Sequence, residues 1–177
     1  MLSGISHDLR TPLTRIKLQL ALIKDNEISK KLSEDVEEME KMLNEYLQFS
    51  SSTSTEKNEL FDLSELILNT ISKYENSKIS LEQADKIFFN GRKNLIQRCL
   101  NNLIDNGIRY SENMKIKHEK LKKNIFITID DDGPGIPETE YENVFKPFYK
   151  IDKSRSRSKS SVGLGLSISS DIIRSHG

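Results

Sequence analysis

The sequence predicts an α+β protein in which a helical hairpin precedes an α/β two-layer sandwich. Three observations predict it: helical spacing of apolar residues through the first fifty or so positions, a run of serine and threonine, and alternating helix and strand patterns in the remainder. Such an alternation favours one sheet covered by helices. The predicted organisation is a hairpin over residues 1–50, a linker over 51–58 and an α/β domain over 59–177.

The composition is that of a polar chain with balanced charge. Its 177 residues include 27 basic and 27 acidic ones, so bulk attraction to nucleic acid or to an anionic membrane is not expected. The single cysteine, Cys99, excludes an internal disulfide, and its aliphatic neighbours favour a core position over a reactive thiol. Without a membrane-spanning run or a signal peptide, the chain is expected to be cytoplasmic.

The first part carries two narrow apolar stripes. In residues 9–23 the apolar positions alternate at spacings of four and three, and the pattern resumes over residues 32–46 after an interruption at 25–29. Two such helices cannot shield their own seam, so we expect a homodimer whose hairpins form a four-helix bundle. A hairpin packed against its own chain is the alternative. Pro12 is expected to bend or loosen the first helix.

The second part follows a Ser/Thr tract at residues 50–55, which is predicted to be a linker, with an exposed loop as the alternative. Further elements are predicted in this order: a helix over 60–74 with Asp62 or Ser64 as its cap, a strand at 87–89, a helix over 92–108, a strand over 123–130, and a last helix that ends at Ser175.

His7 stands beside Asp8 where the first helical pattern begins. A neutral imidazole has a free ring nitrogen near pH 7, and an adjacent carboxylate can orient the other nitrogen and accept its proton. This pair therefore suits a nucleophilic histidine. The clue gains weight from three motifs downstream, each of a kind that holds a nucleotide.

The first motif is a pair of asparagines. Asn102 and Asn106 are four residues apart and share a helix face with Arg109. Amide oxygens can ligate Mg²⁺, and a guanidinium can meet phosphate oxygens. A solvated helix face is the alternative for this pair.

The second motif is the turn at Asp131, Gly133 and Gly135, directly after a predicted strand. Glycines let backbone approach a flat ligand, and a carboxylate can accept a hydrogen bond from an exocyclic amine. A tight acidic turn without a ligand explains the local chemistry equally well.

The third motif, at residues 161–168, is a glycine-bearing turn that leads into a helix, where backbone amides can face phosphate. A helix start without a ligand is the alternative. Between the second and third motifs lie aromatic residues at 145–149 and a basic tract at 151–160. Their location favours a flap near a triphosphate over a disordered arm that touches nucleic acid.

Taken in order, these motifs resemble those of the sensor histidine kinases of two-component signalling. The H box lies around His7, where residues 6–16 look most like the osmosensing EnvZ type, and the N box begins at Asn102. The G1 box spans 131–135, the F box runs from Phe145 to Phe148, and the G2 box spans 163–166. The resemblance implies a phosphoacceptor hairpin followed by an ATP-binding domain of the Bergerat (GHKL) fold, in a part that is cytoplasmic in inner-membrane relatives.

The same resemblance implies a protein histidine kinase. His7 would attack the γ-phosphate of ATP while Asp8 takes up the Nδ1 proton, and the phosphoryl group would pass to an aspartate of a response-regulator receiver domain. Thr11 matches the position linked to the reverse phosphatase activity. A nucleic-acid partner and a direct membrane span are not expected.

The resemblance also implies ATP and Mg²⁺ as cofactors. Asn102 and Asn106 would position Mg²⁺ and the phosphates near Arg109, while Asp131 contacts the adenine amine and Tyr110 lies along the base. The remaining residues expected around the nucleotide are Gly133, Gly135, Ile136, Phe145, Phe148, Gly163, Leu164, Gly165 and Leu166.

The sequence departs from the family pattern in three places. Arg92 stands where the family often has aspartate, Ser161 replaces a customary glycine, and two final strands are expected to be missing, as in a C-terminally truncated chain. Two alternatives follow: a truncated, non-catalytic dimeric remnant that binds ATP or a response regulator, and a gyrase-like or chaperone-like ATPase.

Overall fold

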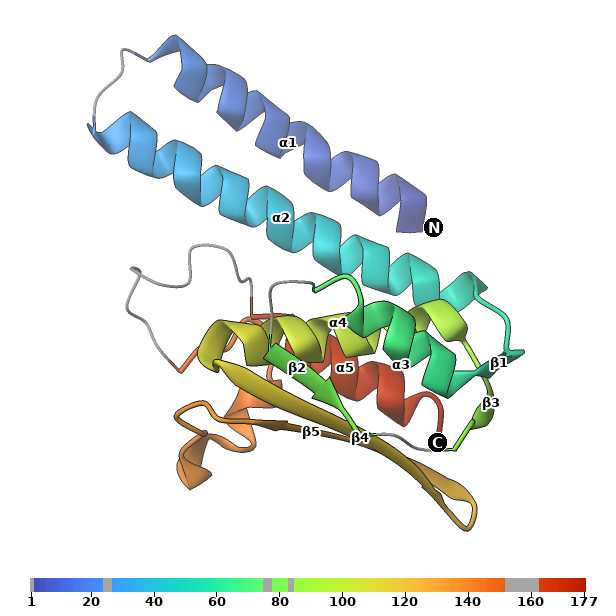
Figure 1. Ribbon diagram of the computed structural model, residues 1–177. Coiled ribbons are helices and arrows are strands. Elements are labelled where there is room, and N and C mark those ends of the chain that lie inside the picture. The colour runs from blue at the N-terminus through green and yellow to red at the C-terminus, as the bar shows by residue number, and fades with distance from the viewer. Residues whose placement is uncertain (1, 24–26, 75–77, 83–84, 152–162) are drawn as a thin grey trace. The chain divides into compact units, whose positions relative to one another are not determined.

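The computed structural model describes residues 2–23, 27–74, 78–82, 85–151 and 163–177, with backbone alone for 2–10 and 45–55 (Figure 1). The chain forms two compact units, the first made mainly of residues 1–55 and the second of residues 56–153 and 165–177. We call them the hairpin unit and the α/β unit, and each is described by itself.

The hairpin unit consists of α1 (Leu2–Leu22) and α2 (Glu27–Thr55), which lie side by side (Figure 1). Its buried cluster is formed by Leu13, Leu20 and Val36, with Leu43 packed against it. An ion pair between Lys17 Nζ and Glu40 Oε2, 2.7 Å apart, also joins the two helices. Pro12 lies inside α1, which remains helical on both sides of it. The predicted hairpin is therefore confirmed.

Only part of the predicted apolar stripe is buried within one chain. Ile16, Ile23, Leu32 and Met39 belong to the stripe but are 39% to 52% exposed. The hairpin thus covers one portion of its seam with its own side chains and leaves the other portion accessible.

The connection to the second unit is shorter than predicted. The helix α2 continues through Thr55, so residues 51–55 are helical and only residues 56–58 separate α2 from the first strand. Serine and threonine have only moderately unfavourable helix propensities, so a helix already formed can propagate through them.

A two-stranded ribbon opens the α/β unit. The strand β1 (Glu59–Asp62) pairs antiparallel with β3 (Phe88–Gly91), and the rings of Phe61 and Phe89 meet edge to face, 5.8 Å between centroids. The helix predicted from Leu60 begins later, as α3 (Leu63–Ile71), because Leu60 belongs to β1. Asp62 caps α3 by accepting hydrogen bonds from the backbone N–H groups of Ser64 and Glu65, so the predicted cap is confirmed.

A three-stranded sheet follows in the order β2 (Lys78–Leu81), β4 (Asn113–Leu121) and β5 (Asn124–Asp131). The strand β2 runs parallel to β4, and β4 runs antiparallel to β5. The sequence predicted β5 but neither β2 nor β4. In β4 the buried residues Met114, Ile116 and His118 alternate with polar ones, and the histidine weakens the apolar contrast of this strand.

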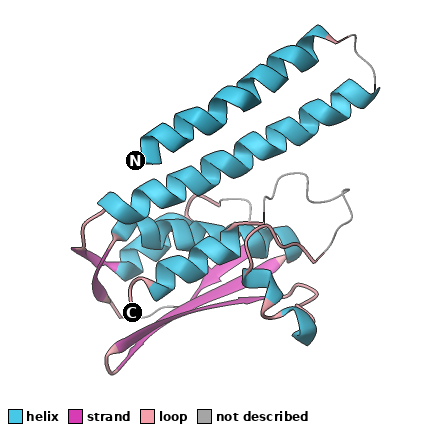
Figure 2. Cartoon of the chain, turned by 180° about the vertical axis from the view of Figure 1, so that it is seen from behind, coloured by secondary structure: helices cyan, strands magenta, loops and turns pink. Residues whose placement is uncertain are grey.

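Two longer helices, α4 (Lys93–Tyr110) and α5 (Gly165–Arg174), lie with α3 on one face of this sheet (Figures 1 and 2). Less than 2% of the surface of each of these core side chains is exposed: Ile67, Leu95, Leu100, Ile104, Ile116 and Ile172. The predicted two-layer α/β sandwich is confirmed.

Cys99 lies in this core with 3% of its surface exposed, as predicted, and burial raises the pKa of its thiol. Among the helices that the structure describes, none combines the length and apolar character needed to cross a bilayer.

Candidate active site

Helix α4 carries the asparagine pair. Leu95, Cys99 and Ile104 are buried on this helix, whereas Asn102 and Asn106 are half-buried. The core thus fixes the rotation of α4 about its axis, and the two amides, one turn apart, lie at the margin of the packed face. Arg109 is also half-buried, and Tyr110, the last residue of α4, is 47% exposed.

Asn102 joins α4 to the start of α5. Its Nδ2 donates a hydrogen bond to the carbonyl oxygen of Gly165, 3.3 Å away. Within the described part of the chain, no hydrogen bond is made to Asn102 Oδ1, so this oxygen can serve as a ligand. The structure therefore brings together the first and third sequence motifs, which are 63 residues apart.

The second motif folds against the end of α4. Asp131 ends β5, and its Oδ1 accepts a hydrogen bond of 2.9 Å from the Gly133 N–H. A Cβ at Gly133 would lie 2.7 Å from Asp131 Oδ1 and 2.9 Å from the Tyr110 carbonyl oxygen, so only glycine fits there. No described residue donates a hydrogen bond to Asp131 Oδ2, which leaves this oxygen available to an amine.

Asp132 holds the turn in place and was given no role by the sequence. Its Oδ1 accepts hydrogen bonds of 2.9 Å from the backbone N–H groups of Glu112 and Asn113, and the side chain of Asn113 donates to Oδ2. These bonds, above all the one from the Asn113 backbone, lower the pKa of the Asp132 carboxyl. In this turn, Asp132 therefore makes the hydrogen bonds that hold the backbone, whereas the Asp131 carboxylate is exposed.

The turn then opens towards solvent. Gly135 adopts φ +72°, a conformation that side chains disfavour, and nothing lies within 4 Å of where its Cβ would be. Ile136 follows with 38% of its surface exposed. Both residues are accessible to a ligand.

The aromatic segment is held by a polar network. Glu140 Oε2 accepts hydrogen bonds from the Tyr149 hydroxyl and from Asn143 Nδ2, and Lys146 Nζ donates to Asn143 Oδ1. The Tyr149 hydroxyl is the main cause that lowers the pKa of Glu140. Phe145 and Phe148 remain about half exposed, so the network fixes the backbone while both rings stay accessible.

The first two residues of the third motif, Ser161 and Val162, lie outside the described part of the chain. The flap predicted at 151–160 also lies outside it, except for Ile151, which is exposed. Gly163 has φ +77°, Leu164 is buried, and Gly165 begins α5, with Leu166 half-buried behind it.

A further contact steadies α4 between its two asparagines. The Tyr74 hydroxyl donates a hydrogen bond of 2.8 Å to Asp105 Oδ1, and burial raises the pKa of Tyr74. The sequence analysis missed this pair, as it missed Glu140 with Tyr149, because the partners come from separate elements and no local pattern links them.

The predicted phosphoacceptor residues lie on α1. The backbone of His7 and Asp8 is helical, while their side chains lie outside the described part of the structure. Thr11 is exposed one helical turn after His7, so the two residues share a helix face.

The donor set fits a cation that arrives with a nucleotide. Among described residues, no cluster of three His, Cys, Asp or Glu side chains is suited to hold a metal. Asn102 and Asn106 offer neutral amide oxygens instead. Because Mg²⁺ keeps several waters and is commonly shared with substrate phosphates, two amides suit it only in the presence of those phosphates.

Comparison with known families gives two matches. Residues 1–55 match the HisKA family, described as the His Kinase A (phospho-acceptor) domain. Residues 91–177 match HATPase_c, the histidine kinase-, DNA gyrase B- and HSP90-like ATPases.

Individual relatives agree with these matches. Sensor histidine kinase GtrS of Pseudomonas aeruginosa is 32% identical over the whole of this chain, which spans 37% of GtrS. Sensor histidine kinase CpxA of Escherichia coli is 32% identical over 99% of this chain and 42% of its own length. The structure of Acinetobacter baumannii histidine kinase AdeS covers 95% of this chain, and the chain covers 86% of that structure, with a TM-score of 0.59 and 28% identity. The chain thus spans about two fifths of the length of these two sequence relatives.

Proposed function

We propose that this chain is part of a sensor histidine kinase, because residues 1–55 match the phospho-acceptor domain and residues 91–177 the ATPase domain. In this proposal the α/β unit binds ATP with Mg²⁺ and the γ-phosphoryl group is transferred to His7. The single observation that carries this proposal is the assembly of three separate motifs along the C-terminal half of α4. The Asn102 side chain contacts Gly165, and the turn at Gly133 contacts both Asp131 and Tyr110.

In the proposed complex, Asp131 recognises the adenine base. Its Oδ2 accepts a hydrogen bond from the exocyclic amine of adenine, while Gly133 keeps the backbone close and Asp132 holds the turn rigid. A rigid carboxylate selects an amine over a carbonyl, which explains a preference for adenine over guanine. Tyr110 and Ile136 supply exposed apolar surface for the base.

The amides of Asn102 and Asn106 position the phosphates through Mg²⁺, which neutralises charge on the transferred group when it is bound. His7 Nε2 then forms a bond to the γ-phosphorus as the bond from that phosphorus to the bridging oxygen breaks, and ADP leaves. Asp8 takes up the Nδ1 proton of the ring. Alignment and charge neutralisation supply most of the acceleration, since phosphoryl transfer demands little covalent chemistry from the protein.

The phosphohistidine is proposed to pass its group to an aspartate on a response-regulator receiver domain, in the cytoplasm. Thr11, exposed one turn beyond His7, is proposed to take part in the reverse phosphatase reaction. Response to osmotic conditions, as in the EnvZ type, is a proposal from the H box alone.

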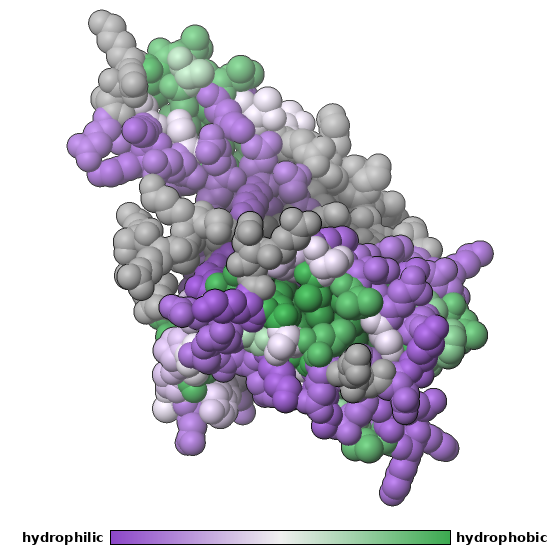
Figure 3. Space-filling view, in the orientation of Figure 1, coloured by the Kyte–Doolittle hydropathy of each residue, from purple (hydrophilic) through white to green (hydrophobic). Residues whose placement is uncertain are grey.

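We further propose that two chains pair through the hairpin unit. The exposed stripe residues Ile16, Leu32 and Met39 support this, because a second hairpin would bury them. Figure 3 also shows hydrophobic side chains gathered near the turn end of the hairpin, where Leu22, Ile23 and Ile28 are exposed.

The experiment is incubation of the chain with ATP labelled at the γ-phosphate. We expect a protein adduct that is labile in acid and stable in alkali, that is lost in His7→Gln, and that requires Mg²⁺. The matched control is Ser3→Ala, which lies on α1, the helix of His7. His118→Gln is not a suitable control, because His118 is buried.

Other outcomes select the alternatives. ATP binding without labelling would identify a non-catalytic ATP-binding partner. Steady phosphate release that is unchanged in His7→Gln would identify a gyrase-like or chaperone-like ATPase, and labelling that survives in His7→Gln would remove His7 from the proposal.

A further inference from the structure

Helix α4 begins without a cap of its own. Its N-cap residue is Arg92, in an extended conformation, and the Arg92 side chain makes no capping hydrogen bond. The first N–H groups of a helix need acceptors, which Ser, Thr, Asp or Asn at the N-cap usually provide. Arginine has no acceptor to offer.

Glu56 supplies the missing acceptor. The backbone N–H of Asn94, the second residue of α4, donates a hydrogen bond of 2.7 Å to Glu56 Oε1. Glu56 is the first residue after α2, and 38 positions separate it from Asn94. A carboxylate at a helix N-terminus also interacts favourably with the helix dipole.

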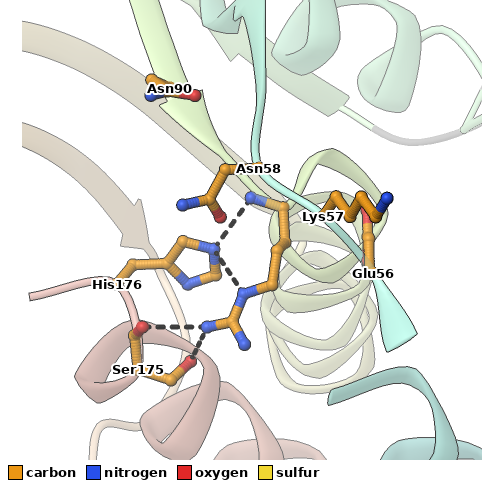
Figure 4. Close-up of a pocket in the computed structure, with 7 residues that line it drawn as sticks. Glu56, Lys57, Asn58, Asn90, Ser175 and His176 are labelled. Carbon is orange, nitrogen blue, oxygen red and sulfur yellow. Dashed lines mark hydrogen bonds between the residues drawn. The ribbon is translucent and has the colours of Figure 1, made fainter. Parts of the chain in front are cut away.

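The Arg92 side chain is used elsewhere. Its Nη2 donates a hydrogen bond of 2.8 Å to the carbonyl oxygen of Ser175 and another to the Ser175 hydroxyl. The backbone N–H and Nε of Arg92 both donate to His176 Nε2, at 3.1 Å and 3.4 Å, as the dashed lines in Figure 4 show. His176 Nδ1 lies 2.7 Å from the Ile172 carbonyl, so the ring donates from Nδ1 and accepts at Nε2.

These contacts join α4 to both ends of α5. At one end Arg92 holds Ser175 and His176, which directly follow α5, and at the other Asn102, in the middle of α4, holds Gly165, the first residue of α5. Glu56 lies at the Arg92 end, where it lines a cleft of about 450 Å³ together with Lys57, Asn58, Asn90, Arg92, Ser175 and His176 (Figure 4).

We propose that Glu56 is a positioning residue, which caps α4 from the connector at residues 56–58 and thereby couples that connector to the helix of Asn102 and Asn106. The proposal rests on the proposed function, in which α4 positions ATP. When Glu56 leaves Asn94, the first turn of α4 frays and the clamp between Arg92 and α5 loosens. A displacement of the connector therefore shifts α4 and, with it, Asn102 and Asn106 at the nucleotide site.

The test measures amide hydrogen exchange at Asn94 and Leu95 by NMR on the full chain without nucleotide. Glu56→Ala should accelerate exchange at these amides roughly two- to thirty-fold, the range that corresponds to the usual effect of losing a cap. Glu56→Gln keeps an oxygen acceptor and should have a smaller effect. The matched control is Glu59→Gln, which removes an exposed carboxylate from neighbouring β1.

A second background separates capping from general damage. Arg92→Asp places an acceptor at the N-cap itself, so Glu56→Ala should no longer accelerate exchange in that background, whatever Arg92→Asp costs by itself. Equal acceleration in both backgrounds, or none in the native background, would overturn the proposal.

The link to nucleotide is tested by kinetics. Glu56→Ala should raise KM for ATP several-fold with a smaller change in kcat, and Glu56→Gln should restore much of the affinity. Faster exchange with an unchanged KM would overturn the positioning role. A chain that fails to label His7 at all would defeat the proposed function instead, while the exchange experiment still decides whether Glu56 caps α4.

Discussion

The hairpin unit and the α/β unit bury their apolar side chains to different depths. In the α/β unit, Ile67, Ile104 and Ile116 have no exposed surface, whereas Leu13 and Val36 of the hairpin are each 7% exposed and Leu32 is 45% exposed. An isolated pair of helices has one layer of side chains between its axes, while a sheet covered by helices encloses a core on several sides. The α/β unit therefore completes its own core, and the hairpin holds only part of one.

This difference has a functional consequence. The turn at Asp131 and the helix of Asn102 are positioned by contacts within one unit of one chain. The helix of His7, by contrast, gains its full packing only with a second copy in the proposed dimer. Nucleotide binding should therefore survive in a single chain, while phosphoryl transfer should depend on the assembly of the hairpins.

The largest effect is expected from the core of the α/β unit. Ile104→Ala should lower the free energy of unfolding by about 2–5 kcal/mol, because it removes buried methyl groups and leaves a cavity. Urea unfolding followed by circular dichroism measures it. Leu68→Ala, at a position 55% exposed on α3, is the control and should cost much less. Equal losses of unfolding free energy in the two variants would contradict the contrast between the two units, because they would show that the core of the α/β unit is not closed.

A smaller effect is expected from the hairpin. Leu32→Ser should weaken self-association by about 1 kcal/mol per chain, because pairing can bury only the 45% of Leu32 that is exposed and full burial of a leucine contributes about 1.5–3 kcal/mol. ATP binding should be unchanged. Analytical ultracentrifugation over a range of concentrations measures the association. Leu18→Ser is the control, because Leu18 is 64% exposed and does not belong to the stripe. If Leu18→Ser weakens association as strongly, the stripe is not the interface.

The smallest effect concerns the pH dependence of the exposed G1 turn. The pKa of Asp132 is lowered from its ordinary value of 3.8, chiefly by the Asn113 backbone N–H. Its charged form therefore adds stability above pH 3.8, and this contribution is lost as the pH falls through the lowered pKa. The advantage of the native chain over Asp132→Asn in thermal unfolding should be present at pH 7 and shrink below pH 3.8.

The control for this prediction is Asp130→Asn, which changes a neighbouring exposed carboxylate. Its difference from the native chain should not follow the same course with pH. A difference for Asp132→Asn that stays constant from neutral to acid pH would show that the hydrogen bonds to Asn113 do not act through the charge.

Much of the fold could be predicted because its signals are local. The stripes of α1 and α2, the buried positions of α4, the alternation in β5 and the cap at Asp62 each lie within about one element of sequence. The strand β4 escaped prediction because its inward side chains include His118, which is buried with its Nε2 2.9 Å from the Ser64 hydroxyl, 54 residues away. A local pattern cannot show that a buried polar side chain will meet a partner so distant in the sequence.

By itself, the sequence determined on which helix or turn most of the predicted site residues lie. Only the tertiary structure decided how Asp131 and Asp132 differ in their hydrogen bonds, which oxygen of Asn102 is left to a ligand, and that Glu56 caps a helix whose own N-cap is arginine. The physical reason is the range of the interactions. Helical and strand periodicity arises between near neighbours, whereas hydrogen bonds at α4 join residues 38, 63 and 84 positions apart, which meet only after the chain has folded.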